Sequence, residues 1–153
     1  MCRFCWALVV LLLLLSGGMA YVFIWQGSVR PAADGRTAIV LEPGERALIL
    51  TEMRGFVESI QQVTDGLARE DMEAVVQAAR ASGRAAQQQV PAPLMGKLPL
   101  AFKQLGLDTH QQFDQLALDA EQLGDPAHSL QQLGRLMRNC VACHATYRLE
   151  VGD

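Results

Sequence analysis

Residues 125–148 read DPAHSLQQLGRLMRNCVACHATYR. The Asp-Pro pair that opens this stretch is a strong helix start, because an aspartate side chain can cap free backbone amides and proline is tolerated at the first helical position. Apolar side chains and the residues of a Cys-x-x-Cys-His motif then fall along one side of the predicted helix: Leu130, Leu133, Met137, Cys140, Val141 and His144. We therefore predict a helix from residue 126 to the carboxyl terminus, with this side facing a core.

Three stretches upstream have the same helical periodicity. The first begins near Pro43 and carries one apolar stripe, formed by Ile49, Met53, Phe56, Ile60, Val63 and Leu67. Steps of three and four are typical of a helix that buries one face. A second helix is expected over residues 71–86, where Asp71 can act as the N-cap, and a third over 108–123, where Gly124 ends it.

The segment between the second and third helices does not fit a long helix, because Pro91, Pro93 and Pro99 interrupt it. We predict a crossover there, with one short helix over residues 100–105. The alternation that is typical of strands is absent over any useful length. The sequence therefore predicts an all-α fold, a four-helix bundle with the Cys-x-x-Cys-His motif near its carboxyl end.

The amino-terminal residues form a separate unit. Residues 4–25 contain no charge, and this run is about the 20 residues that a helix needs to span a bilayer. We predict a single-pass transmembrane anchor over residues 1–28, a linker over 29–38 and the bundle over 39–150. The alternative is a cleaved signal peptide that ends at the small residues of 18–20.

The charge balance argues against one class of partner. The chain has 13 Lys and Arg against 16 Asp and Glu, for a formal net charge of −3. Phosphate backbones are bound by clustered basic residues, which this sequence lacks. We therefore expect no nucleic-acid partner.

The motif Cys140-Val141-Ala142-Cys143-His144 is the attachment pattern of c-type haem. Thiols three positions apart lie on nearby parts of a helical turn, within reach of two neighbouring vinyl groups on one porphyrin edge. The next residue is rotated by about 100 degrees, so its imidazole can approach the iron from one face of the ring. We therefore predict one covalent haem c, held by Cys140 and Cys143, with iron ligated by His144.

A disulfide, a zinc site and a redox dithiol are the alternatives for these two cysteines. Zinc needs further ligands, and His110 and His128 have no paired spacing; we expect both to be solvated at helix starts. A redox dithiol needs a strand-to-helix setting. Cys2 and Cys5 form a second Cys-x-x-Cys without a following histidine, and we interpret them as reduced thiols at the membrane edge.

The stretch from Cys140 to Arg148, CVACHATYR, resembles the cytochrome c prime family, in which the haem motif lies near the end of the last helix of a four-helix bundle. The resemblance extends over about residues 39–148. A membrane anchor departs from the usual soluble member of that family. The resemblance also implies that two copies can pair through the first helix, as a homodimer.

The resemblance assigns roles to three further residues. It implies that Met53 on the first helix faces the iron opposite the histidine and serves as a second axial ligand; the alternative is that Met53 packs over an open iron. Phe56, one turn later, would form a wall of that pocket, although ordinary core packing predicts the same burial. Arg148 would pair with a haem propionate or complement the negative end of the last helix.

These expectations lead to a function without catalysis. We expect a membrane-tethered mono-haem cytochrome of the bacterial inner membrane, with its haem domain on the periplasmic side because haem is attached to thiols outside the cytoplasm. It would pass single electrons between partners such as a membrane oxidoreductase. The alternative is a five-coordinate haem protein that binds nitric oxide or carbon monoxide. A peroxidase is disfavoured, because no His or Arg acid-base pair is expected beside Met53.

Overall fold

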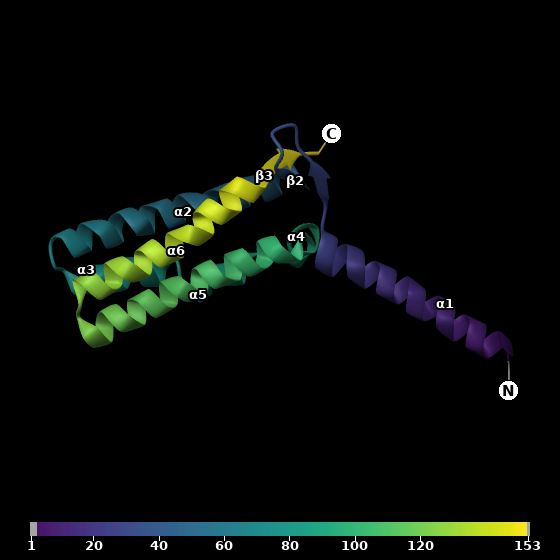
Figure 1. Ribbon diagram of the computed structural model, residues 1–153, viewed down its shortest axis with the longest axis horizontal. Coiled ribbons are helices and arrows are strands. Elements are labelled where there is room, and N and C mark those ends of the chain that lie inside the picture. The colour runs from purple at the N-terminus through teal and green to yellow at the C-terminus, as the bar shows by residue number, and fades with distance from the viewer. Residues whose placement is uncertain (1–2, 153) are drawn as a thin grey trace.

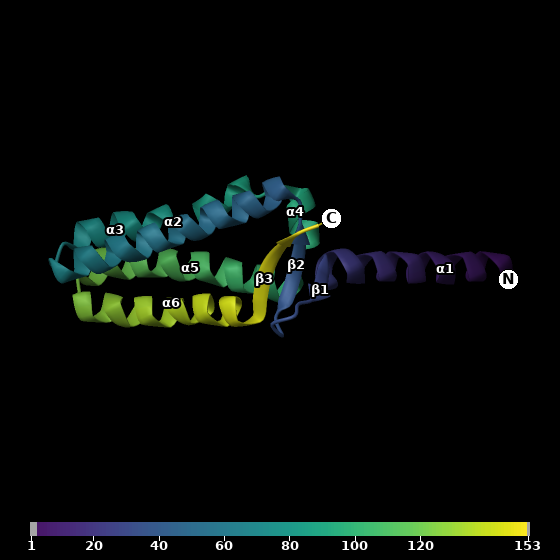
Figure 2. The same ribbon diagram turned by 90° about the horizontal axis from the view of Figure 1, so that it is seen from above.

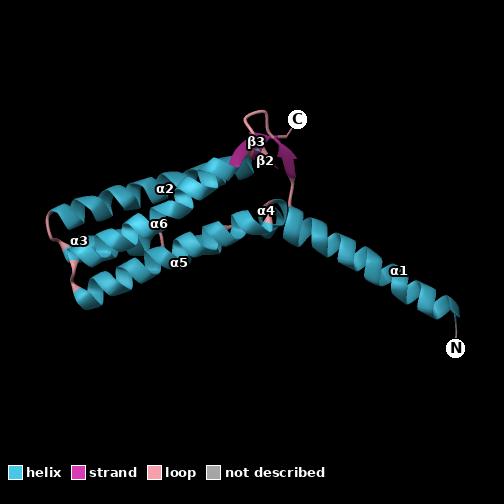
Figure 3. Ribbon diagram, viewed as in Figure 1, coloured by secondary structure: helices cyan, strands magenta, loops and turns pink. Residues whose placement is uncertain are grey.

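The structure, a computed structural model, describes residues 3–152, apart from the side chains of Cys5, Gln88 and Gln89. Cys2 lies outside the described residues. The chain is mostly helical (78%). The described residues form the α-helices α1 Arg3–Ala20, α2 Pro43–Ala68, α3 Met72–Ala81, α4 Ala92–Lys97, α5 Leu100–Leu123 and α6 Pro126–Thr146. One apolar helix, α1, projects from the rest of the molecule (Figures 1 and 3).

Side-chain caps mark the starts of α3 and α6, as the sequence predicts. The Asp71 carboxylate accepts a hydrogen bond from the Ala74 amide at 3.0 Å, and the Asp125 carboxylate accepts one from the Ala127 amide at 2.9 Å. Gly124 ends α5 with φ of 60°. Such caps satisfy backbone groups that a helix end would otherwise leave unpaired.

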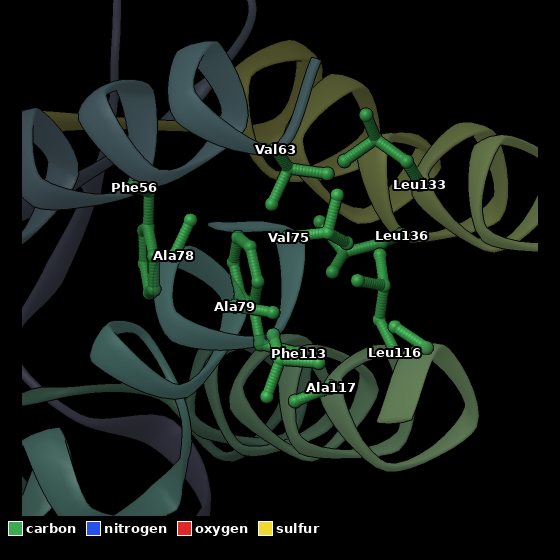
Figure 4. Packing of buried hydrophobic residues seen from close by; sticks show 12 residues of the cluster. Phe56, Val63, Val75, Ala78, Ala79, Phe113, Leu116, Ala117, Leu133 and Leu136 are labelled. Carbon is green, nitrogen blue, oxygen red and sulfur yellow. The ribbon is translucent and has the colours of Figure 1, made fainter. Parts of the chain in front are cut away.

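Helices α2, α3, α5 and α6 lie side by side (Figures 1 and 2). Contacts join α2 to α3, α3 to α5, α5 to α6 and α6 to α2, so α2 and α5 lie diagonally opposite each other. Their apolar stripes meet in one core, formed by Phe56, Val63, Val75, Val76, Ala78, Ala79, Phe113, Leu116, Ala117, Ala120, Leu133 and Leu136 (Figure 4). Alanines on α3 and α5 let the helices approach closely.

A small sheet at one end of the helices corrects the all-α expectation. Its strands are β1 Val29–Pro31, β2 Thr37–Leu41 and β3 Tyr147–Val151, in the order β1-β2-β3. The pair β1-β2 is antiparallel and β2-β3 is parallel, with Thr37 opposite Tyr147. Half of the predicted linker is therefore strand, and the last helix ends at Thr146 instead of the carboxyl terminus. These strands are short and their pairing joins the two ends of the domain, so no local pattern indicates them.

The crossover is also shorter than predicted. The second helix ends at Ala81, and a short 3₁₀ helix, η2 (Arg84–Gln89), and α4 follow it. The third helix begins at Leu100, because Pro99 at the N-cap position can precede a helix without losing a hydrogen bond. The short helix predicted over 100–105 is thus the start of the long α5.

The amino-terminal helix is exposed at every residue whose side chain is described. Residues Trp6–Gln26, which include the π-helical turn η1 (Tyr21–Gln26), have a mean hydropathy of 2.5 and none of this window is buried. The segment is long and apolar enough to cross a membrane, and an export signal has the same properties.

The connection from this helix to the domain is tightly packed. The Ser28 amide donates to the Lys97 carbonyl at 2.7 Å, and the Lys103 ammonium donates to the Ile24 carbonyl at 3.0 Å. Gly27 has φ of 69°, and a β-carbon there would lie 2.5 Å from the Lys97 oxygen. Only glycine fits that turn.

Candidate functional site

A large cavity of about 700 Å³ lies among α2, α4, α5 and α6. Its walls are mostly apolar. Cys140, Cys143 and His144 line it from α6, and Met53 and Phe56 line it from α2. The structure therefore brings together five of the six residues that the sequence singled out.

The motif occupies the last two turns of α6. Cys140 and Cys143 are half-buried and form no disulfide, and His144 is exposed. Burial raises the pKa of the Cys140 thiol, and burial followed by the charge of Cys140 raises that of Cys143. Thiol-disulfide exchange uses thiolates, so neutral thiols disfavour a redox dithiol.

The carbonyl end of this motif is held by a residue of the predicted linker. The Arg36 guanidinium donates to the backbone oxygens of His144 at 3.2 Å and of Tyr147 at 3.3 Å. Asp34 fixes that guanidinium through two further hydrogen bonds, which lower the pKa of the Asp34 carboxyl to about 2. Arg36 therefore stabilises the point where α6 turns into β3. No local pattern of residues indicates this contact.

On α2, Met53 is partly buried and packs against both apolar clusters of the domain. Phe56, one turn later, is buried and stacks on Phe113 of α5, with ring centroids 5.6 Å apart. Its position on the cavity wall agrees with the pocket role and with core packing alike. The two residues are placed together as the helical stripe predicts.

His110 differs from its prediction. It lies in the middle of α5, is 2% exposed and lines the cavity, because α5 begins earlier than expected. Its Nδ1 lies 2.8 Å from the Ser82 carbonyl and its Nε2 lies 3.1 Å from the Glu52 carboxylate. Burial lowers its pKa, but the hydrogen bonds to Glu52 and Ser82 outweigh burial and raise the pKa overall.

The other predicted histidine and the predicted arginine lie outside the cavity lining. His128 is in the first turn of α6, as expected, with Nε2 3.3 Å from the Asp119 carboxylate. Arg148 is in β3 and pairs with Asp34 at 3.3 Å and with Glu150 at 3.1 Å. Because Arg148 is not among the residues that line the cavity, the propionate role stays a prediction that this arrangement does not favour.

The donor set fits haem better than a bare metal ion. Within residues 3–152, no three His, Cys, Asp or Glu side chains converge as the ligands of an ion. Haem iron takes its equatorial ligands from the porphyrin and needs only axial ligands from the chain. Cofactor pockets are mostly apolar and enclose about 300–1,000 Å³, a range that includes this cavity.

No protein-family model, curated protein or solved structure matches this chain.

Proposed function

We propose that the chain is a mono-haem c-type cytochrome, tethered to a membrane by α1, that carries single electrons. In this proposal α2, α3, α5 and α6 form a four-helix bundle like that of the cytochrome c prime family. One observation carries it: the Cys-x-x-Cys-His motif on α6 lines an apolar cavity of haem size that Met53 lines from α2.

Each motif residue has one task in this proposal. The thiols of Cys140 and Cys143 would hold the porphyrin edge, and the His144 imidazole would supply one axial nitrogen. When bound, haem supplies an iron that changes oxidation state by one electron. The apolar walls exclude water from it, with Phe56 forming the part of the wall beside Met53.

Met53 decides between electron carriage and gas binding. A thioether ligand would fill the second axial position and raise the reduction potential, as suits an electron carrier. Met53 lies on the cavity wall and also packs against the core, so its position is compatible with ligation and with packing. The five-coordinate alternative requires that it leave the iron open to nitric oxide or carbon monoxide.

The position of His110 bears on peroxidase activity. A histidine does line the cavity, contrary to expectation, but both ring nitrogens of His110 already have partners. General acid-base catalysis needs a nitrogen that can exchange a proton with the substrate. His110 therefore does not support peroxidase activity, and we propose an electron carrier.

The proposed location is the periplasmic face of a bacterial inner membrane, with α1 as the anchor. The tight packing of residues 24–28 on the domain would hold the haem domain close to the bilayer. Exposed Leu107 and Met137 at the cavity give it an apolar rim. A redox protein in the same membrane would contact that rim.

A spectrum tests the proposal. The full chain is produced in a host that matures c-type cytochromes, and the reduced protein is exposed to carbon monoxide. We expect a low-spin haem that resists carbon monoxide, and a high-spin haem that binds it at once in the M53A variant. Immediate binding by the unmodified chain would favour the gas-binding alternative.

The M95A variant is the matched control for M53A. Met95 also lines the cavity, but it lies in α4 within the crossover. Its spectrum should match that of the unmodified chain. An identical change in both variants would mean that Met53 has no special position.

A further inference from the structure

A chain of buried polar groups lies beside the cavity and has no task in electron transfer. It joins Glu52 to the His110 ring, the ring to the Ser82 carbonyl, and the Ser82 hydroxyl to the Ser59 hydroxyl at 2.8 Å. His110, Ser82 and Ser59 are each at least nine-tenths buried. Buried polar groups must be paired, so these bonds fix the position of every group in the chain.

The chain links two helices that are not neighbours. Glu52 and Ser59 belong to α2, and His110 belongs to α5, which lies diagonally across the domain. Helices α3 and α6 each contact both of them. The distance between α2 and α5 at this level therefore depends on the few side chains that reach across.

The orientation of the His110 ring follows from its partners. A carbonyl oxygen only accepts hydrogen bonds, so Nδ1 must carry a proton and donate to Ser82. This leaves Nε2 pointing at the Glu52 carboxylate. The Phe56 ring packs against the same imidazole, with centroids 4.9 Å apart. The His110 ring of α5 thus contacts one residue of α2 that precedes Met53 in the sequence and one that follows it.

We infer that His110 is a positioning residue, which holds the turn of α2 from Glu52 to Phe56 so that Met53 faces the cavity. Glu52 precedes Met53 by one residue and Phe56 follows it by one turn. Two contacts to one buried ring prevent that turn from rotating. This inference rests on the proposed function, because it assigns His110 a role in presenting the sixth ligand.

The test compares H110L with H128N in the full chain, purified in detergent after haem maturation. His128 is the matched control, because its ring also joins two helices through a carboxylate, here α6 to Asp119 of α5, but it does not line the cavity. The first measurement is the fraction of reduced haem that binds carbon monoxide. We expect about a tenfold rise in H110L, the size expected for loss of a hydrogen bond to a charged group, and no change in H128N.

The second measurement does not depend on haem. Backbone hydrogen exchange over residues 49–57 should be about tenfold faster in H110L, again with no change in H128N. If the unmodified chain carries no haem, the proposed function fails, and this measurement still decides whether His110 holds α2. Should H110L fail to fold, E52A removes the same contact at a less buried position. The inference would be overturned if H110L, or E52A used in its place, gave the same result as the H128N control.

Discussion

The two walls of the cavity are built in different ways. The α6 wall takes three functional residues from five consecutive positions, Cys140 to His144. The other wall takes Met53 and Phe56 from α2 and His110 from α5, and the His110 ring packs against Phe56 and pairs with Glu52. The first wall depends on local helix geometry, whereas the second depends on how distant helices pack.

This difference predicts which substitutions prevent porphyrin attachment and which alter only the pocket or the stability. Changes on α6 should decide whether a porphyrin is held at all. Changes on α2 and α5 should leave it attached and alter the pocket or the stability.

The largest effect on stability is expected from F113A. Phe113 is fully buried and stacks on Phe56, so its removal leaves a cavity behind the α2 wall. Such a change lowers the free energy of unfolding by about 3–5 kcal/mol. Urea unfolding followed by circular dichroism measures it. The control is L118A on the same helix, where Leu118 is 43% exposed and we expect a change within about 0.5 kcal/mol. Similar losses in both variants would contradict this account of the core.

A smaller effect is expected on the α6 wall from R36A. The Arg36 guanidinium binds the carbonyls of His144 and Tyr147, and its loss should lower the free energy of unfolding by roughly 1–2 kcal/mol. Hydrogen exchange over residues 143–148 should become faster. R30A is the control, because Arg30 pairs with Glu150 on the same sheet. Among the described residues, Arg30 forms no hydrogen bond to α6. If R30A and R36A behave alike, Arg36 has no special role at the motif.

The smallest effect concerns pH. Hydrogen bonds to Glu52 and Ser82 raise the pKa of His110 in the folded chain above its usual value. The stability that the protonated His110 ring adds is therefore complete below about pH 6.5 and is lost as the pH rises through the folded pKa. The difference in unfolding free energy between the unmodified chain and H110L should therefore be larger at about pH 6 than at about pH 9. A difference that is constant or grows with pH would show that Glu52 does not stabilise the protonated ring.

The sequence allowed prediction of what is local. Asp71, Asp125 and Gly124 mark helix ends because capping depends on neighbouring residues, and the structure confirms these ends. The apolar stripe likewise placed Met53 and Phe56 on the core side of their helix. The motif could be interpreted for the same reason, since its spacing is the spacing of one helical turn.

What could not be predicted depends on contacts between distant residues. The strand Thr37–Leu41 exists because it pairs with Tyr147–Val151, and neither is long enough to show alternation. The sequence predicts that this helix begins at residue 108, eight residues after its actual start at Leu100. That prediction places His110 near a helix end and in solvent. Its partners Glu52 and Ser82 come from two other parts of the chain. No spacing in the sequence indicates such a network.

The central claim is that two cysteines of α6 hold a porphyrin covalently. Intact mass spectrometry of the denatured chain, produced with the haem maturation system and extracted with acidified organic solvent, tests it directly. We predict a polypeptide heavier by one haem that keeps its colour, and a colourless polypeptide of unmodified mass when both Cys140 and Cys143 are replaced by serine. An unmodified mass for the natural sequence, with all pigment in the solvent, would contradict the claim.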